Sequence, residues 1–113
     1  MRLITNNIEK KLNNSPLAST TEQGYKAKVI VKFFNPLGKE RWFVTEGEKQ
    51  NNGDWLLYGI FLKNDEIEWG YFALSDLEEI ELPFNLKIER EKYYDGGDTL
   101  EDSIKREMRN LYD

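Results

Sequence analysis

The sequence contains no histidine and no cysteine in its 113 residues. The absence of cysteine excludes disulfide bonds and thiolate metal sites, and it removes the commonest sign of a secreted protein. The absence of histidine excludes the usual general base near neutral pH, imidazole-activated nucleophiles and the commonest zinc ligand. Any catalysis would rest on Asp, Glu, Lys, Arg, Tyr, Ser or Thr, and we expect a cytoplasmic protein without a cofactor.

Long hydrophobic runs are also missing. No apolar stretch approaches the roughly 20 residues that a membrane-spanning helix requires. No signal peptide is recognisable, because Leu3-Ile4 is followed at once by the polar residues Thr5-Asn6-Asn7. The length suits one hydrophobic core, and the 13% aromatic content argues against disorder despite 33% charged residues. The sequence therefore predicts one folded domain over residues 1–113, in no contact with a membrane.

The net charge of −5 is unevenly distributed. Residues 1–74 carry ten Lys or Arg against nine Asp or Glu, whereas residues 75–113 carry six against twelve. Seven carboxylates fall between residues 65 and 81, a segment without any Lys or Arg; they are Asp65, Glu66, Glu68, Asp76, Glu78, Glu79 and Glu81. This segment would repel a phosphate backbone, so direct nucleic-acid binding is disfavoured.

Four segments are rich in β-branched and aromatic residues and are bounded by turn signals, as strands are. They are residues 25–34, 41–45, 55–62 and 67–74. The turns between them are predicted at Asn35-Pro36-Leu37-Gly38, Asn52-Gly53 and Asn64-Asp65. Short connections between successive strands favour an antiparallel meander, with the first strand in a central position. A further edge segment is expected around Leu86, Ile88 and Tyr93-Tyr94.

Three helices are expected around these strands. The first follows Thr5 as N-cap and ends at residues 13–16, and residues 17–25 are predicted to form a loop. The second is short, from about Asp76 to Ile80, with Ser75 and Glu78 forming a capping box.

The third helix is expected over residues 98–112, with Asp98 or Thr99 as its N-cap. It carries an apolar stripe of Leu100, Ile104, Met108 and Leu111. Docking of this stripe on the sheet is the favoured interpretation, and presentation to a partner or to a second copy is the alternative. Together these elements predict an α+β fold, an antiparallel sheet of four to five strands with the helices packed on one face.

Several tracts of the sequence carry a family resemblance. They are Leu3-Ile4-Thr5, Val31-Lys32-Phe33-Phe34 with Pro36, Trp42-Phe43-Val44-Thr45-Glu46, Gly70 to Glu78, and Leu86-Lys87-Ile88-Glu89-Arg90 with Tyr93. They resemble a small bacterial domain-of-unknown-function family carried on plasmids, conjugative elements and phages. The resemblance covers about residues 1–94, with Ala73 in place of a common Ser and a polar insertion around residues 50–52. It implies a genomic context and no mechanism.

The seven carboxylates are the candidate partner-binding residues. Held together on an open face, they could imitate a phosphate backbone or engage an Arg- and Lys-lined groove. The simpler interpretation is a solvated face plus acids that favour a helix N-terminus. The leading hypothesis is a non-enzymatic protein-binding module of a phage or mobile element. In its concrete form, this module inhibits a host nucleic-acid-handling effector such as a CRISPR nuclease through that effector's basic surface.

Two other functions stay open. Aromatic residues with nearby cations could stack bases in an accessory nucleic-acid-binding protein, although such residues usually form a core. They are Trp42, Trp55, Trp69, Phe33, Phe34, Tyr58, Tyr71 and Phe72, with Lys28, Lys32 and Arg41. A carboxylate-metal hydrolase would need converging acids and a lysine, for which Glu9 with Lys11, or Glu89, Glu91 and Lys92, are available.

Overall fold

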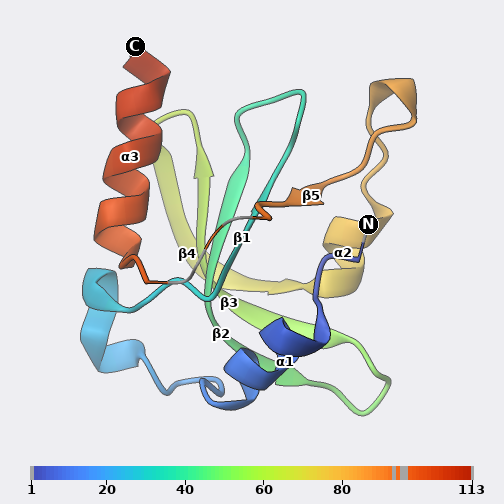
Figure 1. Ribbon diagram of the computed structural model, residues 1–113, viewed down its shortest axis with the longest axis vertical. Helices are drawn as coiled ribbons and strands as arrows, with labels where there is room; N and C mark the ends of the chain where they lie inside the picture. Colours follow the sequence, from blue (N-terminus) through green and yellow to red (C-terminus); the bar gives the residue numbers. More distant parts are fainter. Residues whose placement is uncertain (1, 93, 95–96, 113) are drawn as a thin grey trace.

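The computed structural model describes residues 2–92, 94 and 97–112, without the side chains of residues 110–112. Its helices and strands, in chain order, are α1 (Asn6–Asn13), the 3₁₀ helix η1 (Thr21–Lys26), β1 (Val31–Phe34), β2 (Arg41–Lys49), β3 (Trp55–Lys63), β4 (Glu66–Ala73), α2 (Leu74–Glu79), the 3₁₀ helix η2 (Pro83–Asn85), β5 (Glu89–Arg90) and α3 (Leu100–Tyr112). Figure 1 shows the sheet between α3 on one side and α1 and α2 on the other. The predicted α+β class is confirmed.

The sheet has the strand order β4-β3-β2-β1-β5, with every pair antiparallel. The first four strands form the predicted meander, and the predicted turns join them. Gly53 and Asn64 occupy these turns at φ values of 89° and 58°, a backbone conformation that Gly and Asn tolerate best. The fifth strand returns over a long connection to pair with β1. The middle strand is therefore β2, and β1 is internal without being central.

The first strand is shorter than the predicted segment 25–34. Residues 21–26 form η1, so the expected loop over 17–25 also contains a helical turn. Lys28 pairs with Thr99, and the Val29 amide donates to the Asp98 carbonyl oxygen at 2.9 Å. The chain just before β1 is thus held by the segment that leads into α3. This long-range pairing replaced the continuous strand that local propensity predicted.

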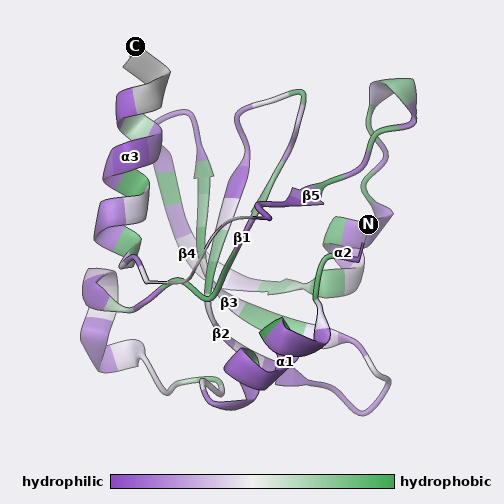
Figure 2. Cartoon of the chain, viewed as in Figure 1, coloured by the Kyte–Doolittle hydropathy of each residue, from purple (hydrophilic) through white to green (hydrophobic). Residues whose placement is uncertain are grey.

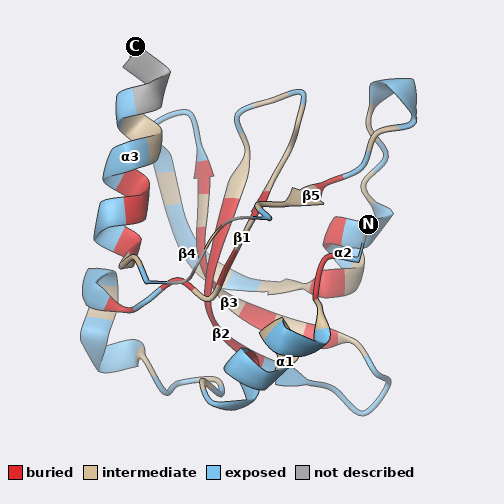
Figure 3. Ribbon diagram, in the orientation of Figure 1, coloured by how far each residue is buried: buried red, intermediate tan, exposed pale blue. Residues whose placement is uncertain are grey.

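Helices cover both faces of the sheet, so the prediction that they all pack on one face is wrong. On one face, called here the α3 face, Leu100 and Ile104 of α3 pack with Phe43, Ile60 and Leu62 of the sheet. Figure 3 shows buried residues on the side of α3 that faces the sheet and exposed residues on its outer side. The predicted docking of the α3 stripe is confirmed for Leu100 and Ile104; the side chain of Leu111 lies outside the described part.

On the opposite face, called the α1 face, the N-terminal segment, α1 and α2 pack on the sheet. Their buried residues are Leu3, Ile4, Leu12, Leu74 and Leu77. Figure 2 shows hydrophobic residues on the strands and on the helices that cover them. On β2, Trp42 and Val44 pack in the core of the α1 face, and Phe43 between them packs in the core of the α3 face, so successive apolar residues supply both faces. A sheet with two apolar faces needs two layers of cover, and this determines the positions of the helices.

The helix caps agree with prediction at two ends and differ at the third. The Thr5 hydroxyl accepts from the Ile8 amide at 3.2 Å, and the Thr99 hydroxyl accepts from the Asp102 amide at 3.2 Å. The predicted capping box of Ser75 and Glu78 is wrong. Helix α2 begins at Leu74, and Ser75 donates its hydroxyl and its amide to Asp54, at 2.6 and 3.1 Å. The carboxylate of Asp54, in the β2–β3 turn, therefore accepts from Ser75 in place of the predicted carboxylate of Glu78.

Candidate partner-binding surface

The seven predicted carboxylates are all exposed. Among the residues that the structure describes, none of them forms an ion pair with a lysine, an arginine or another cation. The six ion pairs found in the described part of the chain all involve other acids. The acidic segment therefore presents unneutralised charge to solvent.

The structure places these carboxylates in two groups and not in one patch. Asp65, Glu66 and Glu68 lie at the β3–β4 turn and the start of β4, whereas Asp76, Glu78, Glu79 and Glu81 lie in and just after α2. Residues 69–73 of β4 lie between the two groups, while Glu66 and Glu68 stand near the beginning of the strand. At roughly 3.3 Å per residue, that strand extends over about 23 Å. We call β4 together with the seven carboxylates at its ends the β4 strip.

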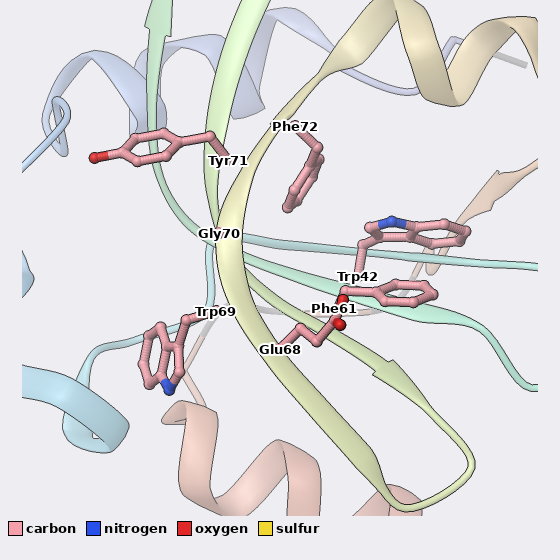
Figure 4. A pocket seen from close by; sticks show the side chains of 7 residues that line it. All are labelled: Trp42, Phe61, Glu68, Trp69, Gly70, Tyr71 and Phe72. Atoms are coloured by element: carbon pink, nitrogen blue, oxygen red, sulfur yellow. The ribbon is translucent and has the colours of Figure 1, made fainter.

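The strand between the two groups lies at an edge of the sheet. Within the described residues, β3 is the only strand that pairs with β4. Figure 4 looks onto this strand, with Phe72, Trp42, Phe61 and Glu68 on one side of it and Trp69 and Tyr71 on the other. The outer N–H and C=O groups of an edge strand are available to another chain.

A shallow apolar hollow of about 260 Å³ lies beside β4. On the α1 face its walls are Trp42, Phe61 and Phe72, and Gly70 forms part of the lining. Gly70 stands opposite Gly59 in the hairpin, so that two neighbouring positions of this face carry no side chain. A Cβ atom at Gly70 would have no atom within 4 Å. The open space at Gly70 therefore belongs to the hollow, whereas a Cβ atom at Gly59 would lie 1.9 Å from the carbonyl oxygen of Phe43.

The α3 face of β4 carries a cluster of exposed aromatic rings. Tyr71 is 61% exposed and Trp69 is 39% exposed. Tyr58 of β3 lies between them, with ring centroids 4.8 Å from Tyr71 and 6.0 Å from Trp69, and Tyr25 of η1 contacts Trp69 edge to face. Burial raises the pKa of the Tyr58 hydroxyl, with smaller contributions from Tyr71 and Glu46. Large exposed aromatic surface is typical of a protein-interaction site.

The residues proposed as a base-stacking platform do not share one surface. Phe33, Trp42 and Trp55 are buried in the core, and only part of the set contributes to the exposed cluster. Two of the cations, Lys32 and Arg41, contact Glu107 of α3 and so anchor that helix. The third, Lys28, is exposed.

The hydrolase candidates are likewise dispersed. Glu9 and Lys11 lie on α1, whereas Glu89 belongs to β5 and Glu91 lies 4.0 Å from Lys32. Within the described part of the chain, no three or more Asp or Glu side chains are grouped so that they could hold a metal ion. Among the residues that the structure describes, no helix has the length and apolar character needed to cross a bilayer.

One exposed residue was not anticipated. Phe84 is 86% exposed in the loop between α2 and β5, which projects from the body of the molecule in Figure 1. It has a φ of 64°, a value that is uncommon for residues other than Gly, Asn or Asp. The Leu82 amide donates to the Leu86 carbonyl oxygen at 3.0 Å and closes the loop beneath it. No sequence pattern signals a left-handed phenylalanine.

These features define an α+β domain with an open antiparallel sheet and an acidic edge. The chain belongs to the family described as "Protein of unknown function (DUF2958)", which it matches over residues 3–109. The match continues past residue 94, where the resemblance noted in the sequence ended, and includes most of α3. Comparison with curated proteins and with solved structures gives no match.

Proposed function

We propose that this protein is a non-enzymatic protein-binding module and that it binds a basic surface of its partner through the β4 strip. The observation that carries the proposal is the exposure of seven carboxylates without a paired cation in the described structure. Unpaired surface charge of one sign steers an oppositely charged partner and raises its association rate.

The arrangement favours an elongated partner surface. The two acidic groups stand at opposite ends of β4, with aromatic rings and an apolar hollow between them. Aromatic anchors at the centre and charges toward the rim form the usual plan of a protein interface. A compact basic patch would reach only one group of carboxylates, whereas a lysine- and arginine-lined groove would reach both.

In its narrower form, the proposal identifies the partner as a nucleic-acid-handling effector. Such proteins carry long basic grooves for phosphate backbones, and an acidic strip competes for the same cations. The chain resembles a domain family that is carried on plasmids, conjugative elements and phages. This resemblance supports the proposal that the protein inhibits a host defence effector, of which a CRISPR nuclease is one example.

Affinity capture from host lysate, followed by kinetics on the captured protein, tests the proposal. In one variant, Glu78→Lys and Glu79→Lys reverse two charges after β4. The matched control, Glu22→Lys with Glu48→Lys, reverses two exposed charges elsewhere, and both variants change the net charge from −5 to −1 because two reversals add four units. We expect the first variant to associate about tenfold more slowly at low ionic strength, with a flatter salt dependence, and the control to change far less.

If both variants slowed association equally, the effect would come from net charge alone and not from the position of the acids. An unchanged association rate in the Glu78→Lys/Glu79→Lys variant would contradict binding through the acids that follow β4. The same preparation, mixed with nucleic acid and Mg²⁺ or Mn²⁺, should show no turnover, and turnover would favour the hydrolase hypothesis instead.

A second candidate function, accessory nucleic-acid binding, is favoured only by the exposed aromatic cluster around Trp69 and Tyr71. Stacking of single-stranded bases on such rings is tolerant of sequence. A gel-shift titration with single-stranded DNA at low salt separates the two functions. Saturable binding below micromolar concentration, lost on Trp69→Ala with Tyr71→Ala, would support the second function.

A further inference from the structure

The geometry of the sheet edge points to the binding mode, and we infer that β4 accepts an extended peptide segment of its partner as an additional strand. The segment carries basic residues beside Glu66 and Glu68 and places a large apolar side chain in the hollow at Gly70. This inference rests on the proposed function and specifies the structure that the partner presents.

In the described part of the chain, the outer edge of the β4 backbone has the length and the unpaired hydrogen-bonding groups that such pairing requires. It is eight residues long, and only its inner edge is paired in the described structure. The opposite edge of the sheet offers no equal template, because β5 contains two residues. A long unpaired edge attracts another strand, and proteins normally shield it. Strand addition at such an edge is an established mode of peptide recognition, in which main-chain hydrogen bonds supply affinity and alternate side chains supply specificity.

The side chains of β4 set the sequence preference. On the α1 face, Glu66, Glu68 and Gly70 follow one another at every second residue, and the added strand would place its own alternate residues beside them. Side chains directly opposite or diagonal to carboxylates are favourable when they are cationic. The peptide should therefore carry Lys or Arg at two alternate positions.

The next alternate position of the peptide lies beside Gly70. The open hollow there measures about 260 Å³ and is walled by Trp42, Phe61 and Phe72. An apolar cavity of about 150 Å³ already accommodates benzene, so the hollow has room for one large apolar side chain. On the other face, the alternate residues of the peptide would contact the exposed rings of Trp69 and Tyr71.

Charge argues against a second copy as the occupant. Two β4 strands paired antiparallel would bring the acidic groups of one molecule toward those of the other. Neither copy carries a lysine or arginine between residues 64 and 86 that could neutralise them. A basic partner segment removes this repulsion, whereas a second copy adds to it.

Short peptides test the inference by fluorescence anisotropy and by amide hydrogen exchange on the full-length protein. The probes are KTKTFT and its reverse FTKTKT, in which two lysines and one phenylalanine share a face. The comparison peptides are KTKFTT, which moves phenylalanine to the other face, and KTKTFT with alternate backbone amides methylated. We expect the methylated and shifted peptides to bind about tenfold more weakly, and we expect bound KTKTFT or FTKTKT to protect amides of β4 from exchange.

Gly70→Leu and Gly70→Ala form the matched pair of variants. The backbone at Gly70 is outside the left-handed region, and an added Cβ meets open space, so both variants should fold. Leucine fills the hollow and should weaken peptide binding about tenfold, whereas alanine leaves most of the hollow and should change affinity less than about threefold.

The outcomes separate this inference from the proposed function. Equal binding of the methylated peptide would overturn strand addition and leave recognition by the acids intact. Equal binding of QTQTFT, which lacks lysine, would contradict the proposed function and leave edge pairing intact. Failure of all peptides to bind at millimolar concentration, or a wild-type dimer that Gly70→Leu converts to monomer in sedimentation, would overturn the peptide as the occupant.

Discussion

A single carboxylate, Asp54, connects the β2–β3 turn to the start of α2. It accepts from the Trp55 amide at 2.7 Å and from the amide and hydroxyl of Ser75. The hydrogen bond from the Ser75 hydroxyl, which outweighs the opposing effect of burial, holds the pKa of Asp54 below its ordinary value. The contact fixes α2, and with it the carboxylates that follow β4, relative to the sheet.

Asp54→Asn should therefore destabilise the fold in a pH-dependent way. A depressed folded-state pKa means that the charged Asp54 stabilises the fold above the unfolded-state pKa of about 3.9. That stabilisation is lost as the pH falls through the folded-state value. Urea denaturation at pH 7 should show a loss of about 1 kcal/mol for Asp54→Asn, and the difference from wild type should narrow below about pH 4. A difference that stays constant from pH 7 to pH 3 would exclude the charged hydrogen bond as its cause.

Phe84 offers a second test at the scale of one residue. Its side chain is 86% exposed while its backbone has a φ of 64°. At an ordinary position, glycine is less stable than alanine by about 0.5–1 kcal/mol, but in the left-handed region the order is reversed. We expect Phe84→Gly to be about 1 kcal/mol more stable than Phe84→Ala in urea denaturation, and Phe84→Ala to lie close to wild type. A marked loss in the alanine variant would show that Phe84 packs against the fold.

At the scale of the element, local sequence signals predict the pairing of strands that short turns connect. The turn at Asn64-Asp65 fixes Lys63 opposite Glu66, and the same register sets Gly59 opposite Gly70. The pairing of the two glycines could thus have been found from the sequence. Long-range pairing could not: neither the return of β5 to β1 nor the bridge from Lys28 to Thr99 has a local signal. The hydrogen bond from Ser75 to Asp54, in place of the one predicted with Glu78, is also a long-range contact without a local signal.

Helix α3 provides the prediction at this scale. Glu107 contacts both Lys32 of β1 and Arg41 of β2, and the three side chains are only 12–22% exposed. Glu107→Ala leaves two largely buried cations without this carboxylate and should cost about 2 kcal/mol in urea denaturation. Glu101→Ala, which breaks the exposed pair with Lys105 on the same helix, should cost at most about 0.5 kcal/mol. Equal losses would show that α3 docks through its apolar stripe alone.

At the scale of the whole molecule, the composition identified the acidic residues but not their arrangement. Along the sequence, the seven carboxylates of residues 65–81 form one cluster, although the strand predicted over residues 67–74 separates its two halves. A strand is extended, so residues at its two ends are far apart, whereas the same number of residues in a helix would stay close. The acids flank an edge of the sheet, and this position gives them a second physical role beyond recognition.

That role is protection of the edge. Charged residues on an exposed edge strand oppose pairing between copies. Replacing Glu66 and Glu68 by glutamine removes two of the acids, keeps their size and leaves the remaining interactions of β4 unchanged. Without this repulsion, we expect β4 edges of two copies to pair. Sedimentation velocity over a concentration series at pH 7 should therefore show self-association of Glu66→Gln/Glu68→Gln at concentrations where the wild type is monomeric.

The control for self-association neutralises acids away from the edge. Glu22→Gln with Glu48→Gln changes the net charge from −5 to −3, as does the test variant, because each replacement removes one negative unit. If lower net charge alone promoted association, both variants would associate equally. If the edge is responsible, only the β4 variant associates, and the added Gly70→Pro replacement, which disrupts the strand, should reverse the effect. A monomeric β4 variant at every concentration would show that the unpaired edge is protected by something other than its carboxylates.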